Sequence, residues 1–310
     1  MFPNISLAFA GLLWIVSAGV SRGDETKVTP DVVYGHKDGM ALVMHVYRPA
    51  NANGAAVVQI NSSGYFSFWE PTNPKAPLVG LFLDRGFTVF SVFHGSNPKY
   101  TVPEIVGDMR RAIRFIRLHA EDYGIDPKRL GVIGTSAGGH LALMLATTGD
   151  DGNAEARDEL SRTSSRVAAA VAIAAPSDLR DMDQKREQLL QKGTIDKLFA
   201  EKLKPAFAFD PALVESLSPR LQVTGDDAAT LLIHGDTDTL VPIENSQNLL
   251  AELNEKSVPT ELIVMEGIGH HAARNPAEAA QWDKAFKGSV AWFDKYLAAP
   301  QPPSQAAEAQ

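Results

Sequence analysis

Short apolar runs alternate with helical segments along most of this chain, and the alternation constrains the fold more than any other feature. Ala55–Ile60 and Phe87–Phe93 are apolar almost throughout, which is typical of strands buried on both faces of a sheet. A long segment with helical spacing begins at Pro103 and runs to about Tyr123. Strands that alternate with helices predict βαβ units, hence an α/β fold with a mostly parallel sheet flanked by helices.

The other predicted strands and helices also alternate, except in one segment between Asp178 and Leu221. The segment from Asp178 to Leu221 is charged, has a helical pattern and lacks a clear strand, so we expect a small helical cap insertion at about 178–221. The other predicted strands are Val28–Tyr34, Leu42–Tyr47, Arg129–Ile133, Val167–Ala174, Thr230–Ile233 and Glu261–Met265, and the other predicted helices are Pro77–Arg85, Ala137–Thr147, Ile243–Glu255 and Pro276–Leu297.

The first residues have the pattern of a signal peptide. Leu7–Val20 is apolar and matches the length of the hydrophobic region of such peptides, and Ser21 and Gly23 form a cleavage pair before Asp24. The lack of Lys or Arg in the first six residues leaves an uncleaved membrane anchor as the alternative, although 14 apolar residues are short for a span. We expect residues 1–23 to direct export, so that the protein is secreted or periplasmic. Residues 300–310 form a polar tail that we expect to be disordered.

Charge and cysteine content exclude several classes of partner and site. The formal net charge is −8 and the basic residues form no run, which argues against nucleic acid and anionic membrane surfaces as partners. The chain has no cysteine, so it has no disulfide, no thiolate metal site and no cysteine nucleophile. The sequence carries no signal for an oligomeric state.

The stretch Gly134-Thr135-Ser136-Ala137-Gly138 fits the pattern G-x-S-x-G between a predicted strand and a predicted helix. In such a turn a serine nucleophile adopts a strained backbone conformation, and small residues two positions before and after it avoid clashes. The serine also lies at a helix N-terminus, where free N–H groups favour negative charge. The alternative is an ordinary N-cap by Thr135 or Ser136, but a cap does not require the surrounding glycines.

A serine hydroxyl needs a base, and the base needs a third group that orients it. Both candidates follow later strands, in the order acid then histidine. Asp236 and Asp238 lie in HGDTDTLVP after one strand, and His270 and His271 lie in GIGHH after the next. Because the carboxyl ends of parallel strands share one edge of the sheet, we expect these side chains to lie near Ser136.

Four segments give the chain a resemblance to a known superfamily. In order, they are Tyr123–Val132 (YGIDPKRLGV), Gly134–His140 (GTSAGGH), His234–Pro242 (HGDTDTLVP) and Gly267–His270 (GIGH). They resemble the α/β-hydrolase superfamily of esterases, lipases and prolyl-oligopeptidase-like enzymes, and the chain is similar to secreted carboxylesterases and carbohydrate esterases. The resemblance implies one α/β-hydrolase domain over residues 24–299.

The resemblance also implies the roles of individual residues. Ser136 is the nucleophile, Asp238 is the triad acid because it lies four residues after the histidine of the family pattern, and His270 is the base. Asp236 and His271 are the rival acid and base, whereas His234 and His140 are expected to be structural. In enzymes of this superfamily, one donor of the oxyanion hole is the N–H of the residue after the nucleophile, which is Ala137 here.

The second oxyanion donor is expected from the loop after the strand Ala55–Ile60. Family members often carry His-Gly-Gly-Gly in this loop, and this chain departs from them with Asn61-Ser62-Ser63-Gly64-Tyr65. We expect the donor to be Ser62 or Ser63, and Asn61, Gly64 and Tyr65 to contact substrate or orient the loop. The aromatic residues that follow suggest either an acyl or sugar pocket or packing of the loop; these are Phe66, Phe68 and Trp69.

The leading hypothesis is therefore a serine hydrolase that cleaves carboxylic esters, with a short acyl group or a carbohydrate-linked ester as substrate, through an acyl-enzyme. It requires no metal and no cofactor. Two alternatives stay open: a serine peptidase or amidase of the same fold, and a non-catalytic binding protein on a hydrolase scaffold, because a fold alone does not prove activity.

Overall fold

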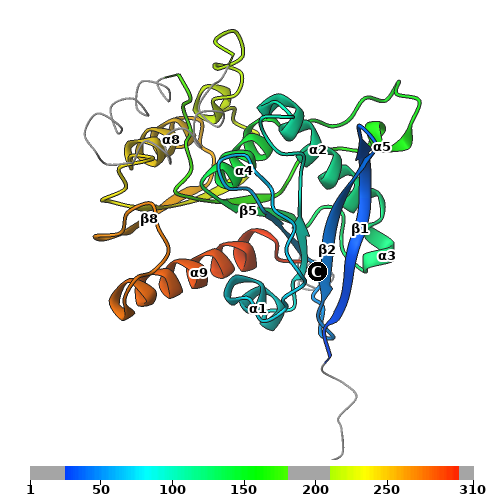
Figure 1. The fold of residues 1–310 in the computed structure, drawn as a ribbon, viewed down its shortest axis with the longest axis horizontal. Coiled ribbons are helices and arrows are strands. Elements are labelled where there is room, and N and C mark those ends of the chain that lie inside the picture. The colour runs from blue at the N-terminus through cyan, green and yellow to red at the C-terminus, as the bar shows by residue number, and fades with distance from the viewer. Residues whose placement is uncertain (1–24, 181–209, 300–310) are drawn as a thin grey trace, which may run out of the picture.

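A computed structural model of the protein describes residues 25–180 and 210–299. Within these ranges, eight strands form one sheet in the order β1-β2-β4-β3-β5-β6-β7-β8 (Figure 1). β2 runs antiparallel to its two neighbours, and every other neighbouring pair is parallel. This topology confirms the predicted α/β class with a mostly parallel sheet.

The observed strands agree with the predicted ones to within a few residues. Their bounds are β1 (Lys27–Lys37), β2 (Met40–Arg48), β3 (Ala56–Ile60), β4 (Thr88–Val92), β5 (Leu130–Thr135), β6 (Ala169–Ile173), β7 (Ala229–Gly235) and β8 (Thr260–Met265).

Helices cover both faces of the sheet (Figure 1). On one face lie α2 (Val102–Leu118), α4 (Ala137–Thr148) and α8 (Glu244–Glu255), and on the other lie α1 (Pro77–Asp84) and α9 (Pro276–Tyr296). The shorter helices are α3 (Ala120–Tyr123), α5 (Glu159–Arg162) and the 3-10 helix η1 (Pro219–Gln222). The loops at the carboxyl ends of the parallel strands all lie along one edge of the sheet, so residues far apart in the sequence meet there.

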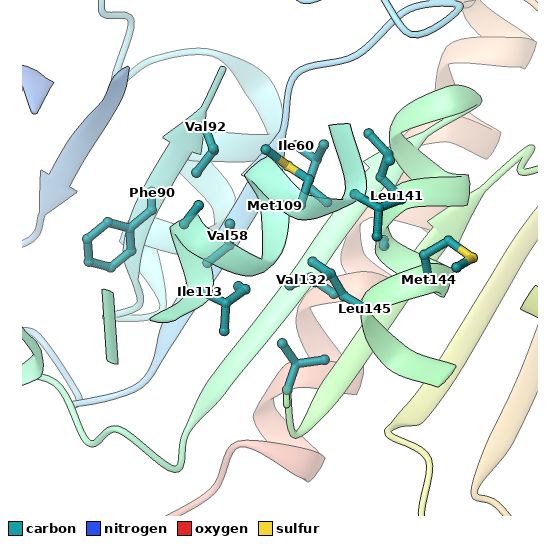
Figure 2. Packing of buried hydrophobic residues seen from close by; sticks show 14 of the residues in the cluster. Val58, Ile60, Phe90, Val92, Met109, Ile113, Val132, Leu141, Met144 and Leu145 are labelled. Carbon is teal, nitrogen blue, oxygen red and sulfur yellow. The ribbon is translucent and has the colours of Figure 1, made fainter. Parts of the chain in front are cut away.

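The central strands are apolar throughout because they are buried on both sides. Val58 and Val132 are partners in the pairing of β3 with β5, and both face α2 and α4. Figure 2 shows Met109 and Ile113 of α2 packed over this face, together with side chains of α4. The alternate residues of the same strands, such as Val57, pack toward α1 and α9. Burial on both faces therefore explains the continuous apolar runs.

The long helix predicted from Pro103 to about Tyr123 is divided in the structure. Its start is as expected, with Pro103 in the first turn and a capping box in which the Glu104 carboxylate accepts from the N–H of Thr101. The helix ends at Leu118, and α3 follows after His119, whose backbone leaves the helical region.

Three predicted segments fall largely or wholly outside the described residues. These are the signal peptide at 1–23, the tail at 300–310 and, apart from its two ends, the cap at 178–221. Among the helices that the structure does describe, none has the length and apolar character needed to cross a membrane.

Candidate active site

Ser136 occupies a strained turn between β5 and α4. Its backbone has φ 55° and ψ −121°, in a region that L-residues rarely adopt. The Ser136 N–H donates to the carbonyl of Ile173 at 2.8 Å, which ties the turn to the neighbouring strand β6. The surrounding structure thus holds a conformation that costs free energy locally, as is common at functional sites. Its φ and ψ differ from the extended backbone typical of an N-cap.

Two glycines of the motif are required by the close approach of backbones. A Cβ on Gly134 would lie 2.3 Å from the carbonyl carbon and oxygen of Gly138, and one on Gly138 would lie 2.9 Å from the carbonyl oxygen of Ile60. The first contact closes the turn on itself. The second brings the start of α4 against the end of β3, with Ser62 also next to Gly138.

Ser136, His270 and Asp238 lie in one hydrogen-bonded line. The Nε2 atom of His270 is 2.9 Å from the Ser136 hydroxyl oxygen, and its Nδ1 atom is 2.7 Å from a carboxylate oxygen of Asp238. The three residues follow β5, β8 and β7 respectively, so the shared edge of the parallel sheet brings them together. With Nδ1–H donating to Asp238, the Nε2 atom has a lone pair directed at the serine hydroxyl.

Asp238 is held as a buried carboxylate. One of its oxygens accepts from the N–H groups of Leu240 at 3.0 Å and Val241 at 2.9 Å. Burial raises the pKa of the carboxyl, but the rings of His234 and His270 and the Val241 N–H outweigh burial and hold that pKa at about 2. Asp238 is therefore ionised at neutral pH and can accept the Nδ1–H of His270.

The rival acid and base have other partners. A carboxylate oxygen of Asp236 accepts from the N–H of Gly267 at 2.6 Å and so joins the two loops. His271 lines the same pocket as His270, but its Nδ1 contacts the carbonyl of Ala272 at 2.9 Å and its Nε2 accepts from the Gly269 N–H at 3.2 Å. Neither residue has a hydrogen bond to Ser136 within the described chain.

The two other histidines of the motifs are buried. His234 lies between the Ser246 hydroxyl and the carbonyl of Val241, at 2.7 and 2.8 Å, and so holds the loop that carries Asp238. His140 contacts the carbonyl of Leu217 at 2.7 Å.

Ser136 and His270 open into a pocket of about 330 Å³. Its lining is largely apolar and includes Ala174 and Met265 at strand ends, Ala272 in the loop between β8 and α9, and Trp282 of α9. A second pocket of about 250 Å³ shares Ser62, Ser63 and Thr135 with the first and has a more polar lining, which includes Gln59, Asn61, Glu70, Phe66 and Phe68. The two pockets therefore adjoin at Ser62, Ser63 and Thr135.

Several lining residues were not expected from the sequence. Ala174 and Met265 follow the same rule as Ser136, Asp238 and His270, since they lie at the carboxyl ends of β6 and β8, and Ala174 has a positive φ of 48°. Because both residues lie at strand ends, the sequence pattern could have predicted that they line the site. Trp282 comes from the N-terminal part of α9, and only tertiary packing brings it to the site.

The backbone of residues 61–67, here called the 61–67 loop, narrows the choice of a second N–H donor. The Ser63 N–H donates to the carbonyl of Phe66 at 2.8 Å and is not available. The Ser62 N–H makes no hydrogen bond within the described residues, and Ser62 lines the pocket beside Ser136. The Ala137 N–H lies in the first turn of α4, where helical N–H groups have no partner along the helix. Ser62 and Ala137 thus offer two free donors.

Asn61 orients the 61–67 loop and lines the second pocket. Its side-chain amide nitrogen donates to the Ser91 hydroxyl at 2.8 Å and to the Val92 carbonyl at 3.1 Å, which uses both of its protons. Gly64 takes a positive φ of 56° at the tip of the loop. The structure does not bring Tyr65 to either pocket, because its ring is buried edge-on against His140 at 5.5 Å.

The aromatic residues of the loop divide between the two expected roles. Phe66 and Phe68 stack on one another with ring centroids 6.3 Å apart and line the second pocket. Trp69 instead donates from its indole N–H to Asp31 at 2.7 Å. No cluster of three or more metal-ligating side chains occurs in the part of the chain that the structure describes.

Comparison with known proteins supports the same assignment of family. The BD-FAE family model matches residues 44–253, more than half of the chain. Esterase LipQ of Mycobacterium tuberculosis is 27% identical over 248 residues, which cover 79% of this chain and 57% of LipQ. Ethyl acetate hydrolase of Pseudomonas putida is 26% identical over 294 residues, which cover 89% of this chain and 85% of the relative. The chain thus spans little more than half the length of LipQ.

Solved structures show the same fold. A truncated carbohydrate esterase from gut microbiota superimposes with a TM-score of 0.69 at 24% identity, over 90% of this chain and 99% of that one. The alignment confirms the expected α/β-hydrolase fold.

Proposed function

Because this chain belongs to the BD-FAE family, we propose that it is a carboxylic ester hydrolase that acts through Ser136, His270 and Asp238. The observation that carries the proposal is the line of hydrogen bonds from Asp238 through His270 to a strained serine at the mouth of a pocket. The names of the relatives, which include esterases and an ethyl acetate hydrolase, agree with this reaction.

The proposed reaction proceeds through an acyl-enzyme. His270 takes the proton of the Ser136 hydroxyl as its oxygen attacks the ester carbonyl, and Asp238 stabilises the imidazolium that forms. The negative oxygen accepts hydrogen bonds from the N–H groups of Ala137 and Ser62. The C–O bond of the ester then breaks, and the alcohol leaves with the proton from His270. A water molecule, deprotonated by the same histidine, hydrolyses the acyl-serine and restores the free serine.

The two pockets suggest how a substrate divides between them. The pocket beside His270 is about 330 Å³ and lined by Ala174, Met265 and Trp282, which suits a short acyl chain. The second pocket has amide, carboxylate and aromatic groups, which suit a polar alcohol such as a sugar. We therefore propose short acyl esters and carbohydrate-linked esters as substrates.

The proposal is tested with a fluorophosphonate probe and a series of p-nitrophenyl esters of increasing acyl length. We expect the wild-type protein to be labelled and to hydrolyse short esters, and Ser136→Ala to lose both properties while it remains folded. Ser216→Ala is the control, because that hydroxyl lies in an exposed turn and donates only to the Leu213 carbonyl. A folded wild-type protein that is neither labelled nor active on any ester would refute the hydrolase assignment.

A further inference from the structure

The hydroxyl of Ser67 lies behind the 61–67 loop and contacts the peptide group that precedes Ser62. Its Oγ donates to the carbonyl oxygen of Asn61 at 2.7 Å and accepts from the N–H of His94 at 3.2 Å. Because the N–H of His94 already points at this oxygen, the hydroxyl proton is directed to the Asn61 carbonyl. The contact therefore has a defined direction.

This hydrogen bond controls the direction of the Ser62 N–H. The carbonyl of Asn61 and the N–H of Ser62 belong to the same peptide group, which is planar and in the trans form points its C=O and N–H in opposite directions. Fixing the carbonyl toward Ser67 therefore fixes the Ser62 N–H toward the opposite side. Ser62 lies beside Gly138 at the start of α4 and lines the pocket that contains Ser136.

The same hydrogen bond also strengthens the donor. A carbonyl that accepts a hydrogen bond polarises the N–H of its own peptide group, so that chains of hydrogen bonds reinforce one another. Here the chain runs from the His94 N–H through the Ser67 hydroxyl to the Asn61–Ser62 peptide. The last N–H of this chain has no partner among the described residues and is free to bind an oxyanion.

Ser67 is itself anchored by a second segment. Its N–H donates to the Ser96 hydroxyl at 2.9 Å, and that hydroxyl contacts the Ser67 carbonyl at 3.3 Å. The segment that carries Ser96 is held in turn by Asp108, which accepts from the Gly95 N–H at 3.0 Å and is paired with Lys37 at 2.9 Å. The loop thus rests on a buried framework without the consecutive glycines that many relatives of this fold carry there.

We propose that Ser67 is a positioning residue, whose hydroxyl orients and polarises the Asn61–Ser62 peptide so that the Ser62 N–H stabilises the oxyanion. This inference rests on the proposed ester hydrolysis. The Ser67 hydroxyl lies outside the triad and contributes to catalysis only when negative charge develops on the substrate oxygen.

The test compares Ser67→Ala with Ser216→Ala on p-nitrophenyl acetate. Both variants lose a serine hydroxyl, but only Ser67→Ala removes the contact with the Asn61 carbonyl, because the Ser216 hydroxyl lies in an exposed turn and donates to the Leu213 carbonyl. Complete loss of one oxyanion donor costs about 10²–10³ in kcat. Since Ser67→Ala leaves the Ser62 N–H in place but free to reorient, we expect kcat to fall about ten- to a hundredfold. KM should change by less than about twofold, because the interaction forms mainly in the transition state.

A second measurement separates positioning from stability. A trifluoromethyl ketone forms a tetrahedral adduct with a catalytic serine, and its negative oxygen requires the same donors. Its affinity should fall in Ser67→Ala by the same factor as kcat/KM, whereas Ser216→Ala should bind it like the wild type. Ser67→Thr, which keeps the hydroxyl, should recover most of the activity, and Ser67→Cys, a weaker donor, should lie between the alanine variant and the wild type.

The outcomes distinguish the two proposals. A wild-type protein that does not hydrolyse the ester overturns the proposed function and this inference with it. An active wild type, together with equal kcat and ketone affinity in Ser67→Ala and Ser216→Ala, overturns the positioning role alone. Should the alanine variant fail to fold, the cysteine and threonine variants decide: equal kcat in these two also overturns it.

Discussion

His140 makes the stability of this protein depend on pH in a way that the structure allows us to calculate. The imidazole is completely buried, and its Nε2 is 2.7 Å from the carbonyl of Leu217. Its Nδ1 has no hydrogen-bond partner among the described residues, so a second proton on the ring would be buried without an acceptor. Burial therefore lowers the pKa of His140 to about 4, although the Leu217 carbonyl favours the charged ring.

The sign and size of the effect follow from linkage between protonation and unfolding. In the unfolded chain the histidine binds a proton below its ordinary pKa of about 6.5, whereas in the folded protein His140 does so only near pH 4. Its contribution is therefore fully present above pH 6.5 and is lost progressively as the pH falls toward 4. With these pKa values, lowering the pH from about 7.5 to about 5 reduces the free energy of unfolding by about 2 kcal/mol.

The assay is urea unfolding of the wild type and His140→Gln at pH 7.5 and pH 5. Glutamine keeps an N–H donor for the Leu217 carbonyl but does not titrate, so the contributions of all other groups cancel in the comparison. We expect the variant to lose about 2 kcal/mol less than the wild type between the two pH values. An equal loss in both proteins would refute the reasoning, because it would mean that His140 is protonated equally in the folded and unfolded states.

Two further predictions concern the site. Asp238→Asn should lower kcat by about 10⁴, since the amide no longer fixes the tautomer of His270. Asp236→Asn is the control: its side chain joins two loops, and kcat should fall by less than about tenfold. Steady-state kinetics on p-nitrophenyl acetate compares the two variants, and equal losses would remove Asp238 from the triad. Gly138→Ala places a Cβ 2.9 Å from the Ile60 carbonyl and should lower the free energy of unfolding by about 1–3 kcal/mol, with a loss of probe labelling; an unchanged melting temperature with full labelling would contradict the close approach.

Most of the architecture follows from local patterns. The run Ala55–Ile60 and the segment before Gly134 are apolar because β3 and β5 are buried on both faces, so their residues alone predict central strands. The break in the helix at His119 was not predicted, because the apolar spacing continues through it while the backbone turns. The positions of Ser136, Asp238 and His270 after the parallel strands β5, β7 and β8 were predictable because such strand ends share one edge.

The sequence by itself determined the α/β class, the turn at Ser136 and the candidates for its partners, because strand burial, glycine spacing and chain order are local properties. Only the tertiary structure showed that the Ser63 N–H is bonded within the loop while the Ser62 N–H has no partner among the described residues, and that Tyr65 lies in the core rather than in the pocket. The first outcome depends on the hydrogen bond from the Ser63 N–H to the Phe66 carbonyl, and the second on the packing of the Tyr65 ring against His140, which lies far along the chain. The direction of a backbone N–H is set by what its peptide group meets in space, and that is not encoded in the type of the residue that carries it.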